Sequence, residues 1–301
     1  MSDLIIRPLA EGEEQLFESL ADPCLVGPGA FGATYRDGAA SGEYRPEWTW
    51  VALRDAAVVA RAAWWAGPGD DAPVVMDWFD FTDAGAAEQL LRTAPVRTEY
   101  SFRLPPDWRD SPAISQAAHA RMAVAQAAGM SFLVERYGYR WTTECGLPTR
   151  PGRLEFQPEP DDDVVFDIFR RVHRDSLDAH ARRAIAESGL DIAARTDLDI
   201  LHRMPGPRDW WRVAYTADGE LAGFIAPTRN HQNPVIGYVA VLPEHRGHGY
   251  SYDLLAEATS LLVAEGADRI VAGTDVPNTP MAATFRRAGY PVTSHRIDLV
   301  Y

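Results

Sequence analysis

The chain has 301 residues and a net charge of −14, with 46% hydrophobic and 24% charged residues. This balance is ordinary for a soluble globular protein, and the length is enough for two domains. The negative charge argues against DNA or RNA as a partner, because a protein needs a positively charged face to bind nucleic acids. The sequence contains no stretch of the ~20 apolar residues that cross a bilayer and no leader pattern. We therefore expect a cytoplasmic protein without a membrane or nucleic-acid partner.

The two cysteines, Cys24 and Cys145, stand far apart and form no metal-ligand spacing. Isolated thiols in a chain of this length are typical of a reducing compartment, so we expect no disulfide framework. No Ser-His-Asp arrangement or cluster of metal ligands stands out, and we expect neither a hydrolase nor a bound metal. His173 and His180 lie in an arginine-rich helical segment, and we interpret both as surface residues.

The two halves of the chain resemble distant copies of each other, and each begins with a short strand and an acidic helix start. In chain order, the first half then predicts strands at 48–53, 58–65 and 74–81, a helix at 84–93, a strand at 96–104, a helix at 112–129 and a strand at 131–142. The second half predicts strands at 211–216, 220–225 and 235–242, a helix at 249–265, a strand at 269–274, a helix at 279–289 and a strand at 291–300. The shared order indicates a duplicated α+β fold around mixed sheets.

The boundary between the copies falls at 146–152, where two prolines and two glycines predict a linker. We therefore predict one domain at 1–145 and a second at 153–301. The copies differ most at 179–207, where the second half carries extra sequence of helical character. This insertion either covers a substrate or elaborates the surface.

The most informative stretch follows the strand predicted at 235–242. It leads through a short loop, residues 246–249 (the glycine loop), into an amphipathic helix. Glycines let a backbone approach a ligand closely, and the N–H groups at a helix start can bind an anion such as a pyrophosphate. The loop has no Gly-Lys-Ser/Thr of a Walker motif, and Tyr252 stands where a dinucleotide-binding loop has its third glycine.

Residues 241–251, VLPEHRGHGYS, resemble the acyl-CoA loop of the GNAT N-acetyltransferase superfamily, whose motif is V-x-P-x-x-R/Q-x-x-G-x-G/A. Arg246 and Gly249 match this motif, and Ser251 stands where Gly or Ala is usual. Asn278 opens a second matching pattern, N-x(10)-G-F/Y, and the order of elements is also that of the family. The whole chain resembles a tandem GNAT protein, similar to mycothiol synthase-like bacterial proteins, with a degenerate N-terminal copy.

The resemblance implies an N-acetyltransferase that transfers an acetyl group from acetyl-CoA, its co-substrate, to the amine of a small molecule. Backbone groups of the strand would bind the pantetheine arm, and amides of the glycine loop would hold the pyrophosphate. The cofactor-binding residues implied are Val239, Ala240, Val241, Arg246, Gly247, His248, Gly249, Tyr250, Ser251, Asn278 and Phe285. Arg286 or Arg287 would either meet the ribose phosphate or face solvent.

The first copy lacks this loop. Its third strand is followed by Thr82-Asp83-Ala84-Gly85, and Asp80 and Asp83 put negative charge where a pyrophosphate would bind. We therefore expect that the first copy does not bind CoA and that it supports the second.

The second copy also lacks the residues that usually transfer protons in the family. Phe285 stands where a Tyr often protonates the thiolate, and Gly237 stands where a Glu often accepts the amine proton. We nominate Asp275, the nearest carboxylate by sequence, as the catalytic residue, although an aspartate at a strand end is also typical of a turn. Tyr238 and Tyr290 are further proton donors to consider. A CoA-binding pseudoenzyme or sensor and a protein N-acetyltransferase therefore stay open as alternatives, and we expect a monomer or homodimer.

Overall fold

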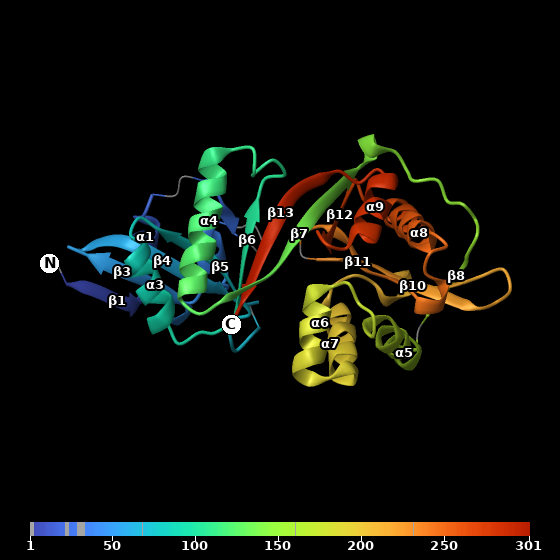
Figure 1. Ribbon diagram of the computed structural model, residues 1–301, viewed down its shortest axis with the longest axis horizontal. Coiled ribbons are helices and arrows are strands. Elements are labelled where there is room, and N and C mark those ends of the chain that lie inside the picture. Colours follow the sequence, from blue (N-terminus) through green and yellow to red (C-terminus); the bar gives the residue numbers. More distant parts are fainter. Residues whose placement is uncertain (1–2, 22–23, 29–33, 68, 160, 231) are drawn as a thin grey trace. The chain divides into compact units, whose positions relative to one another are not determined.

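The computed structural model describes residues 3–21, 24–28, 34–67, 69–159, 161–230 and 232–301 (Figure 1). The chain forms two compact units, of which the second is Tyr137–Thr293 and the first is the preceding chain together with Ser294–Tyr301. Strands β7 (Ser131–Thr142) and β13 (Val292–Val300) therefore pass from one unit into the other along the chain. Residues 146–152, the predicted linker, lie inside the second unit. The domain limits 1–145 and 153–301 stay a prediction.

The first unit is built on a mixed sheet with the strand order β1-β3-β4-β5-β6-β13. Its strands are β1 (Leu4–Pro8), β3 (Thr49–Arg54), β4 (Ala57–Trp65), β5 (Val75–Phe81) and β6 (Glu99–Leu104), and the two-residue β2 (Gly27–Pro28) pairs with β6. Its helices are α1 (Glu14–Glu18), α2 (Tyr35–Ala40), α3 (Ala84–Thr93) and α4 (Pro112–Ala127), with a 3-10 turn at Pro46–Trp48. Neighbouring strands along the order are antiparallel except β5 and β6, which are parallel.

The second unit has the strand order β7-β12-β11-β10-β9-β8. Its strands are β8 (Glu155–Pro158), β9 (Arg212–Tyr215), β10 (Leu221–Arg229), β11 (Pro234–Val241) and β12 (Arg269–Asp275), together with part of β7. Its helices are α5 (Asp162–His173), α6 (Ala179–Ser188), α7 (Leu190–Arg203), α8 (Tyr250–Ala264) and α9 (Thr279–Arg287), with 3-10 turns at Thr143–Cys145, Arg208–Trp210 and Pro243–His245. The predicted insertion is helical, as expected, and it forms α6 and α7.

The sheet of the second unit is covered by helices on both faces. Figure 1 shows α8 and α9 on one face and α5 and α7 on the other. Alternate residues of a strand point to opposite faces. Along β10, Ile225 joins the apolar cluster with α8 and α9, whereas Phe224 and Ala226 join the cluster with α5 and α7. Ala222 also joins the cluster with α8, because the strand register shifts between Leu221 and Gly223. The first unit buries its own two clusters, one of them between the sheet and α3 and α4. Each unit therefore has its own core, and the predicted α+β class is confirmed.

A β-bulge occurs at the same place in both units and aligns the copies residue by residue. Between β4 and β5 the register shifts at Ala63/Trp64 and skips Asp77, and between β10 and β11 it shifts at Ala226/Pro227 and skips Gly237. Asp77 and Gly237 are therefore equivalent positions, and so are Asp80 and Ala240. Within the described parts of the chain, no helix is both long and apolar enough to cross a membrane.

Candidate functional site

The two parallel strands of the second unit that precede α8 and α9 separate toward their carboxyl ends. Within the described residues, the register between β11 and β12 is Val235 with Val271, near the start of β11. On its other side β11 stays paired with β10, through Val239 with Ile225 and Ala240 with Phe224. The strand edge at 239–241 therefore faces the opening, where an extended ligand can add its own hydrogen-bonding groups to the strand.

The glycine loop follows this edge and leads into α8. Gly247 and Gly249 have φ angles of 84° and 75°, which side-chain-bearing residues rarely adopt. Gly249 is also the N-cap of α8, and no side chain caps the helix there. The first N–H groups of a helix have no intrahelical acceptor, and they form the positive end of its dipole. Residues 246–249 are exposed, so an anion can reach these groups.

Ser251 departs from the Gly or Ala expected at its position, and the structure explains why a serine fits. Its hydroxyl lies 2.8 Å from the Thr284 hydroxyl on α9, and the Thr284 hydroxyl donates to the Pro280 carbonyl at 3.0 Å. The Ser251 side chain is thus turned toward α9, and α8 and α9 gain a hydrogen bond.

Asn278 and Phe285 lie on α9 in two different environments. Asn278 is the N-cap, and its side-chain oxygen accepts from the Met281 N–H at 3.3 Å, which leaves its amide nitrogen as the donor for a ligand. Phe285 is buried, stacks on Tyr139 at 4.3 Å between ring centroids and packs edge-on against Tyr290. The Phe285 ring is therefore part of the core beneath the helix.

The cationic side chains near the loop have protein partners. The Arg246 guanidinium donates to the carbonyls of Val172 and Asp175 at 3.3 and 3.4 Å, where α5 ends. The Arg287 guanidinium lies 4.0 Å from the ring centroid of Tyr252. Arg246 therefore connects the glycine loop with the end of α5.

Strand β10 and helix α7 leave little room for a side chain at the strand position where the family often has a glutamate. A Cβ atom built at Gly237 would lie 2.7 Å from the Thr228 side chain and 3.2 Å from Leu201 of α7. Both distances are tighter than ordinary van der Waals contact, so a larger side chain requires a shift of its neighbours. The Ala226 carbonyl, also on β10, would lie at 3.0 Å, so the neighbouring strand accounts for the glycine together with Leu201 of α7.

Asp275 ends β12 and is only 1% exposed. Its Oδ2 atom accepts a hydrogen bond of 2.7 Å from the backbone N–H of Ala179, the first residue of α6. The nominated carboxylate therefore also fastens the start of the inserted helices to the sheet. Its nomination as the catalytic residue stays a prediction.

Of the two tyrosines named as proton donors, Tyr290 is buried and Tyr238 is half-buried. Burial raises the pKa of Tyr290, and its hydroxyl lies 2.7 Å from that of Thr259. Burial, with Asp197 and Asp178 nearby, raises the pKa of Tyr238 well above its usual value. Both hydroxyls therefore keep their protons at neutral pH.

The interpretation of His173 as a surface residue is wrong. Its ring is 2% exposed, stacks on Phe169, and its Nε2 lies 2.9 Å from Asp197 Oδ2 on α7. The arginines beside it in the sequence, Arg170 and Arg171, lie on the outer part of α5, whereas His173 faces the core.

Sequence reasoning missed Arg153, which lies just before β8. Its guanidinium pairs with the buried Asp253 in the first turn of α8, and its Nη1 and Nη2 donate to the carbonyls of His248 and Gly249 at 2.9 and 3.2 Å. The sequence signal that could have found it is Asp253 itself, because an acidic residue in a helix expected to bind an anion needs a cationic partner.

The equivalent helix start in the first unit is closed by its own carboxylate. Asp83 is the N-cap of α3, its Oδ1 accepts from the Ala86 N–H at 3.0 Å, and its Oδ2 pairs with Arg54 at 2.8 Å. These contacts, the Ala86 N–H first, lower the pKa of Asp83. The helix N-terminus that is open in α8 is therefore filled in α3.

The edge of β5 in the first unit is occupied as well. Asp80 is buried between two arginines, with Arg61 Nη2 at 2.9 Å and Arg121 Nη2 at 2.5 Å. Arg121 Nε also donates to the Phe79 carbonyl at 3.0 Å, at the position equivalent to Val239. Arg121 thus occupies a strand carbonyl to which a ligand would otherwise bind, and Asp80 adds a buried carboxylate beside it.

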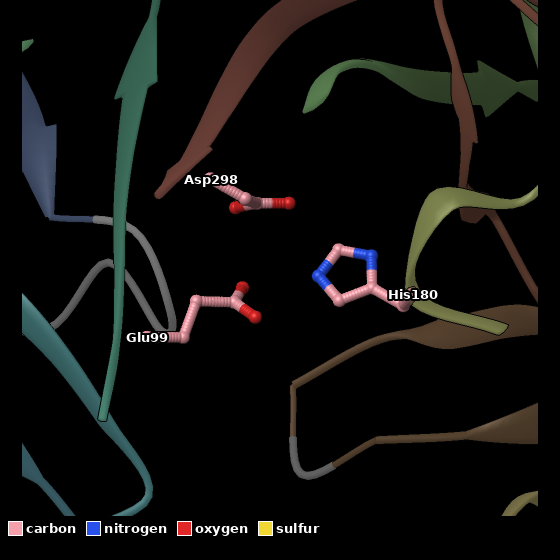
Figure 2. Close-up of side chains that lie close together, drawn as sticks. All are labelled: Glu99, His180 and Asp298. Carbon is pink, nitrogen blue, oxygen red and sulfur yellow. The ribbon is translucent and has the colours of Figure 1, made fainter. Parts of the chain in front are cut away.

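The first unit also holds a pair of carboxylates at its last strand. Figure 2 shows the carboxylates of Glu99 on β6 and Asp298 on β13. The Ser101 hydroxyl lies 3.1 Å from Glu99 Oε1 and 2.6 Å from Asp298 Oδ1, and Arg296 pairs with Asp298 at 2.8 Å. These contacts hold β13 against β6.

Comparisons with known proteins agree with this geometry. Residues 170–290 match the model of the acetyltransferase (GNAT) family. The chain is 27% identical over 196 residues to a mycothiol acetyltransferase of Pseudarthrobacter chlorophenolicus, and this alignment covers 56% of the chain and 55% of that protein. The chain thus spans about half the length of the curated relative it matches.

Two solved structures extend the likeness to the whole chain. A GCN5-related N-acetyltransferase from Sphaerobacter thermophilus has a TM-score of 0.55 at 12% identity, with 98% of this chain and 94% of that one covered. A tandem GNAT protein from the clavulanic acid biosynthesis pathway has a TM-score of 0.54 at 18% identity, with 99% and 98% covered. At these identities the likeness concerns the fold, and it confirms the predicted tandem arrangement. Residues 170–290 thus match the GNAT acetyltransferase family, within a chain that has the fold of tandem GNAT proteins.

Proposed function

We propose that the chain transfers an acetyl group from acetyl-CoA to the amine of a small molecule, and that the reaction takes place in the second unit. The observation that carries this proposal is the start of α8, where Gly249 leaves the first N–H groups open to an anion. The pyrophosphate of CoA would bind there. The pantetheine arm would lie along the edge of β11 at residues 239–241, and Asn278 would donate its amide to it.

The proposal includes one CoA per chain. The first unit has a carboxylate at its helix start and an arginine on its strand carbonyl, and both oppose a bound CoA. Calorimetric titration with acetyl-CoA is expected to give a stoichiometry near one per chain. A stoichiometry near two would contradict the assignment of an occupied edge to the first unit.

The acceptor would enter from the side covered by the inserted helices, since Leu201 of α7 packs near β11 at Gly237. Attack by a neutral amine on the thioester transfers the acetyl group, releases the thiolate and requires the loss of one amine proton. Asp275 is our candidate to accept that proton, and Tyr238 is a protonated donor for the thiolate. Holding the amine against the thioester supplies much of the rate enhancement in such a reaction.

One observation favours a second candidate function, a CoA-binding pseudoenzyme or sensor. Phe285 and Gly237 stand at the usual positions of proton donor and acceptor, and neither can transfer a proton. Thiol release from acetyl-CoA with a panel of small amines distinguishes the two functions. Turnover of at least one amine supports the enzyme, whereas tight CoA binding without turnover supports the sensor. Peptide acceptors in the same assay test a protein N-acetyltransferase.

A further inference from the structure

We propose that Arg153 is a positioning residue that aims the amides of the glycine loop at the CoA pyrophosphate. The proposal deepens the function proposed above and rests on it. Arg153 lies far from the 241–251 segment in sequence, and it reaches the loop from the coil just before β8.

The contacts of Arg153 fix two peptide groups. Its Nη1 donates to the His248 carbonyl at 2.9 Å, and its Nη2 donates to the Gly249 carbonyl at 3.2 Å. A trans peptide is planar, so its N–H points opposite to its C=O. Holding the carbonyls of His248 and Gly249 toward Arg153 therefore turns the N–H groups of Gly249 and Tyr250 away from it, toward the open side of the loop.

The Arg153 guanidinium also neutralises a carboxylate close to the proposed pyrophosphate site. Asp253 lies in the first turn of α8 and is 2% exposed, so its negative charge would repel a pyrophosphate at the helix start. Arg153 neutralises it through Nε at 3.2 Å and through a close Nη2 contact. A buried carboxylate in turn anchors the guanidinium, whose planar fork can serve both the carboxylate and the loop carbonyls.

The arrangement predicts which part of CoA depends on Arg153. The contacts described for Arg153 lie on the glycine loop and on the first turn of α8, where the pyrophosphate would bind, whereas the pantetheine arm would lie on β11. Removal of Arg153 should therefore weaken the binding of CoA and leave the use of acetyl-pantetheine, which lacks the pyrophosphate, unchanged. A residue with a merely structural role would affect both substrates alike.

The experiment compares Arg153→Gln with wild type and with Arg150→Gln. Arg150 pairs with Glu257, one turn further along α8, through a side chain that is 60% exposed, and it is the matched control. We expect about tenfold weaker CoA binding by Arg153→Gln, since hydrogen bonds from a charged group and the neutralisation of Asp253 are lost. The Kd for CoA should be unchanged in Arg150→Gln, and kcat/KM for acetyl-pantetheine should be unchanged in both variants.

Two further variants keep the test decisive. Arg153→Gln combined with Asp253→Asn removes both charges and should recover part of the lost affinity, because the repulsion is gone. Arg153→Lys keeps the charge without the fork and should bind CoA with intermediate affinity, and it replaces Arg153→Gln if that variant does not fold. Amide exchange of residues 249 and 250 in the ligand-free protein should speed up in Arg153→Gln and stay unchanged in Arg150→Gln.

The outcomes separate this proposal from the proposed function. Unchanged CoA affinity and unchanged loop exchange in Arg153→Gln would overturn the role of Arg153 while CoA binding by wild type stands. Equal losses with CoA and with acetyl-pantetheine would also overturn it, in favour of a general structural role. A wild type that does not bind CoA at all would overturn the proposed function, and the role of Arg153 with it.

Discussion

The two units share one fold, and they differ most at the helix start that follows the central pair of strands. In the first unit Asp83 caps α3 with its own carboxylate, whereas in the second unit Gly249 leaves the start of α8 uncapped. The backbone offers the same unpaired N–H groups in both places. One unit uses them for its own stability and the other keeps them available, so the fold alone does not decide whether the site exists.

The strand edges repeat this contrast. Arg61 pairs with Asp80 across β4 and β5, while the equivalent positions across β10 and β11 hold Phe224 and Ala240. In the first unit a charge network occupies the edge, and in the second an apolar pair leaves it open. The edge of the first unit is therefore closed by its side chains, while its strand pairing matches that of the second unit.

The largest expected effect comes from breaking the charge network of the first unit. Asp80→Ala leaves Arg61 and Arg121 buried without their carboxylate, and such a loss typically costs about 3–5 kcal/mol of stability. Chemical denaturation measures this loss, with Asp218→Asn in an exposed turn as the control. A variant as stable as wild type would show that the two arginines find other partners.

Opening or closing the helix start is the next test. Gly249→Glu adds a carboxylate at the start of α8 and a side chain at a φ of 75°, with its Cβ atom 3.6 Å from Arg153 Nη2. We expect CoA affinity to fall by about 100-fold or more, since like charge replaces a favourable anion site. Circular dichroism should stay native, and CoA should no longer raise the Tm.

The matching change in the first unit is Asp83→Asn. It alters the equivalent helix start and is expected to leave CoA affinity unchanged. A similar loss of affinity in both variants would contradict the contrast between the two helix starts.

Two substitutions of Asp275 distinguish its contact with the start of α6 from its proposed role as proton acceptor. Asp275→Asn keeps an oxygen that can accept from Ala179, so stability should hold, whereas Asp275→Ala removes the acceptor and should loosen α6. If Asp275 accepts the amine proton, Asp275→Asn lowers kcat by about 100-fold or more. The loss should shrink at high pH, where more of the amine is already neutral.

The control for Asp275 is Asp268→Asn, at an exposed carboxylate just before β12. An Asp275→Asn enzyme with wild-type kcat at every pH would assign Asp275 to the attachment of α6 alone. Positioning of the amine would then account for the rate.

Local patterns were enough to predict most elements of the fold. The helix at 84–93 and the strand at 131–142 were predicted with the observed bounds, because Asp83 and Gly129 mark the adjoining helix ends. The glycine loop was also readable, since its residues are consecutive and its chemistry lies in the backbone.

Contacts between distant residues could not be predicted in this way. Arg153 and Asp253 are a hundred positions apart, and the residues adjacent to each in the sequence do not indicate the other as its partner. The same holds for Asp275 with Ala179 and for the last eight residues, which join the first unit by pairing with β6. Tertiary pairing decides such contacts, and a single sequence records no trace of it.

The smallest expected effect concerns the hairpin turns, which again differ between the units. The β3–β4 turn places Asp55 and Ala56 at φ angles of 51° and 63°, whereas the corresponding turn before β10 uses Gly219 at 80°. A left-handed conformation costs a side-chain-bearing residue roughly 1–2 kcal/mol, and glycine adopts it freely. Ala56→Gly should therefore stabilise the protein by about 0.5–1 kcal/mol, after the greater freedom of glycine in the unfolded chain is subtracted.

The reverse change, Gly219→Ala, should destabilise the protein by about 1 kcal/mol. A Cβ atom at Gly219 meets nothing within 4 Å, so the cost is conformational and free of steric clash. Denaturant midpoints of the two variants should shift in opposite directions, with unchanged slopes. Shifts of the same sign would mean that packing around these turns outweighs their backbone angles, and that the two hairpins are not equivalent in the way the duplicated fold suggests.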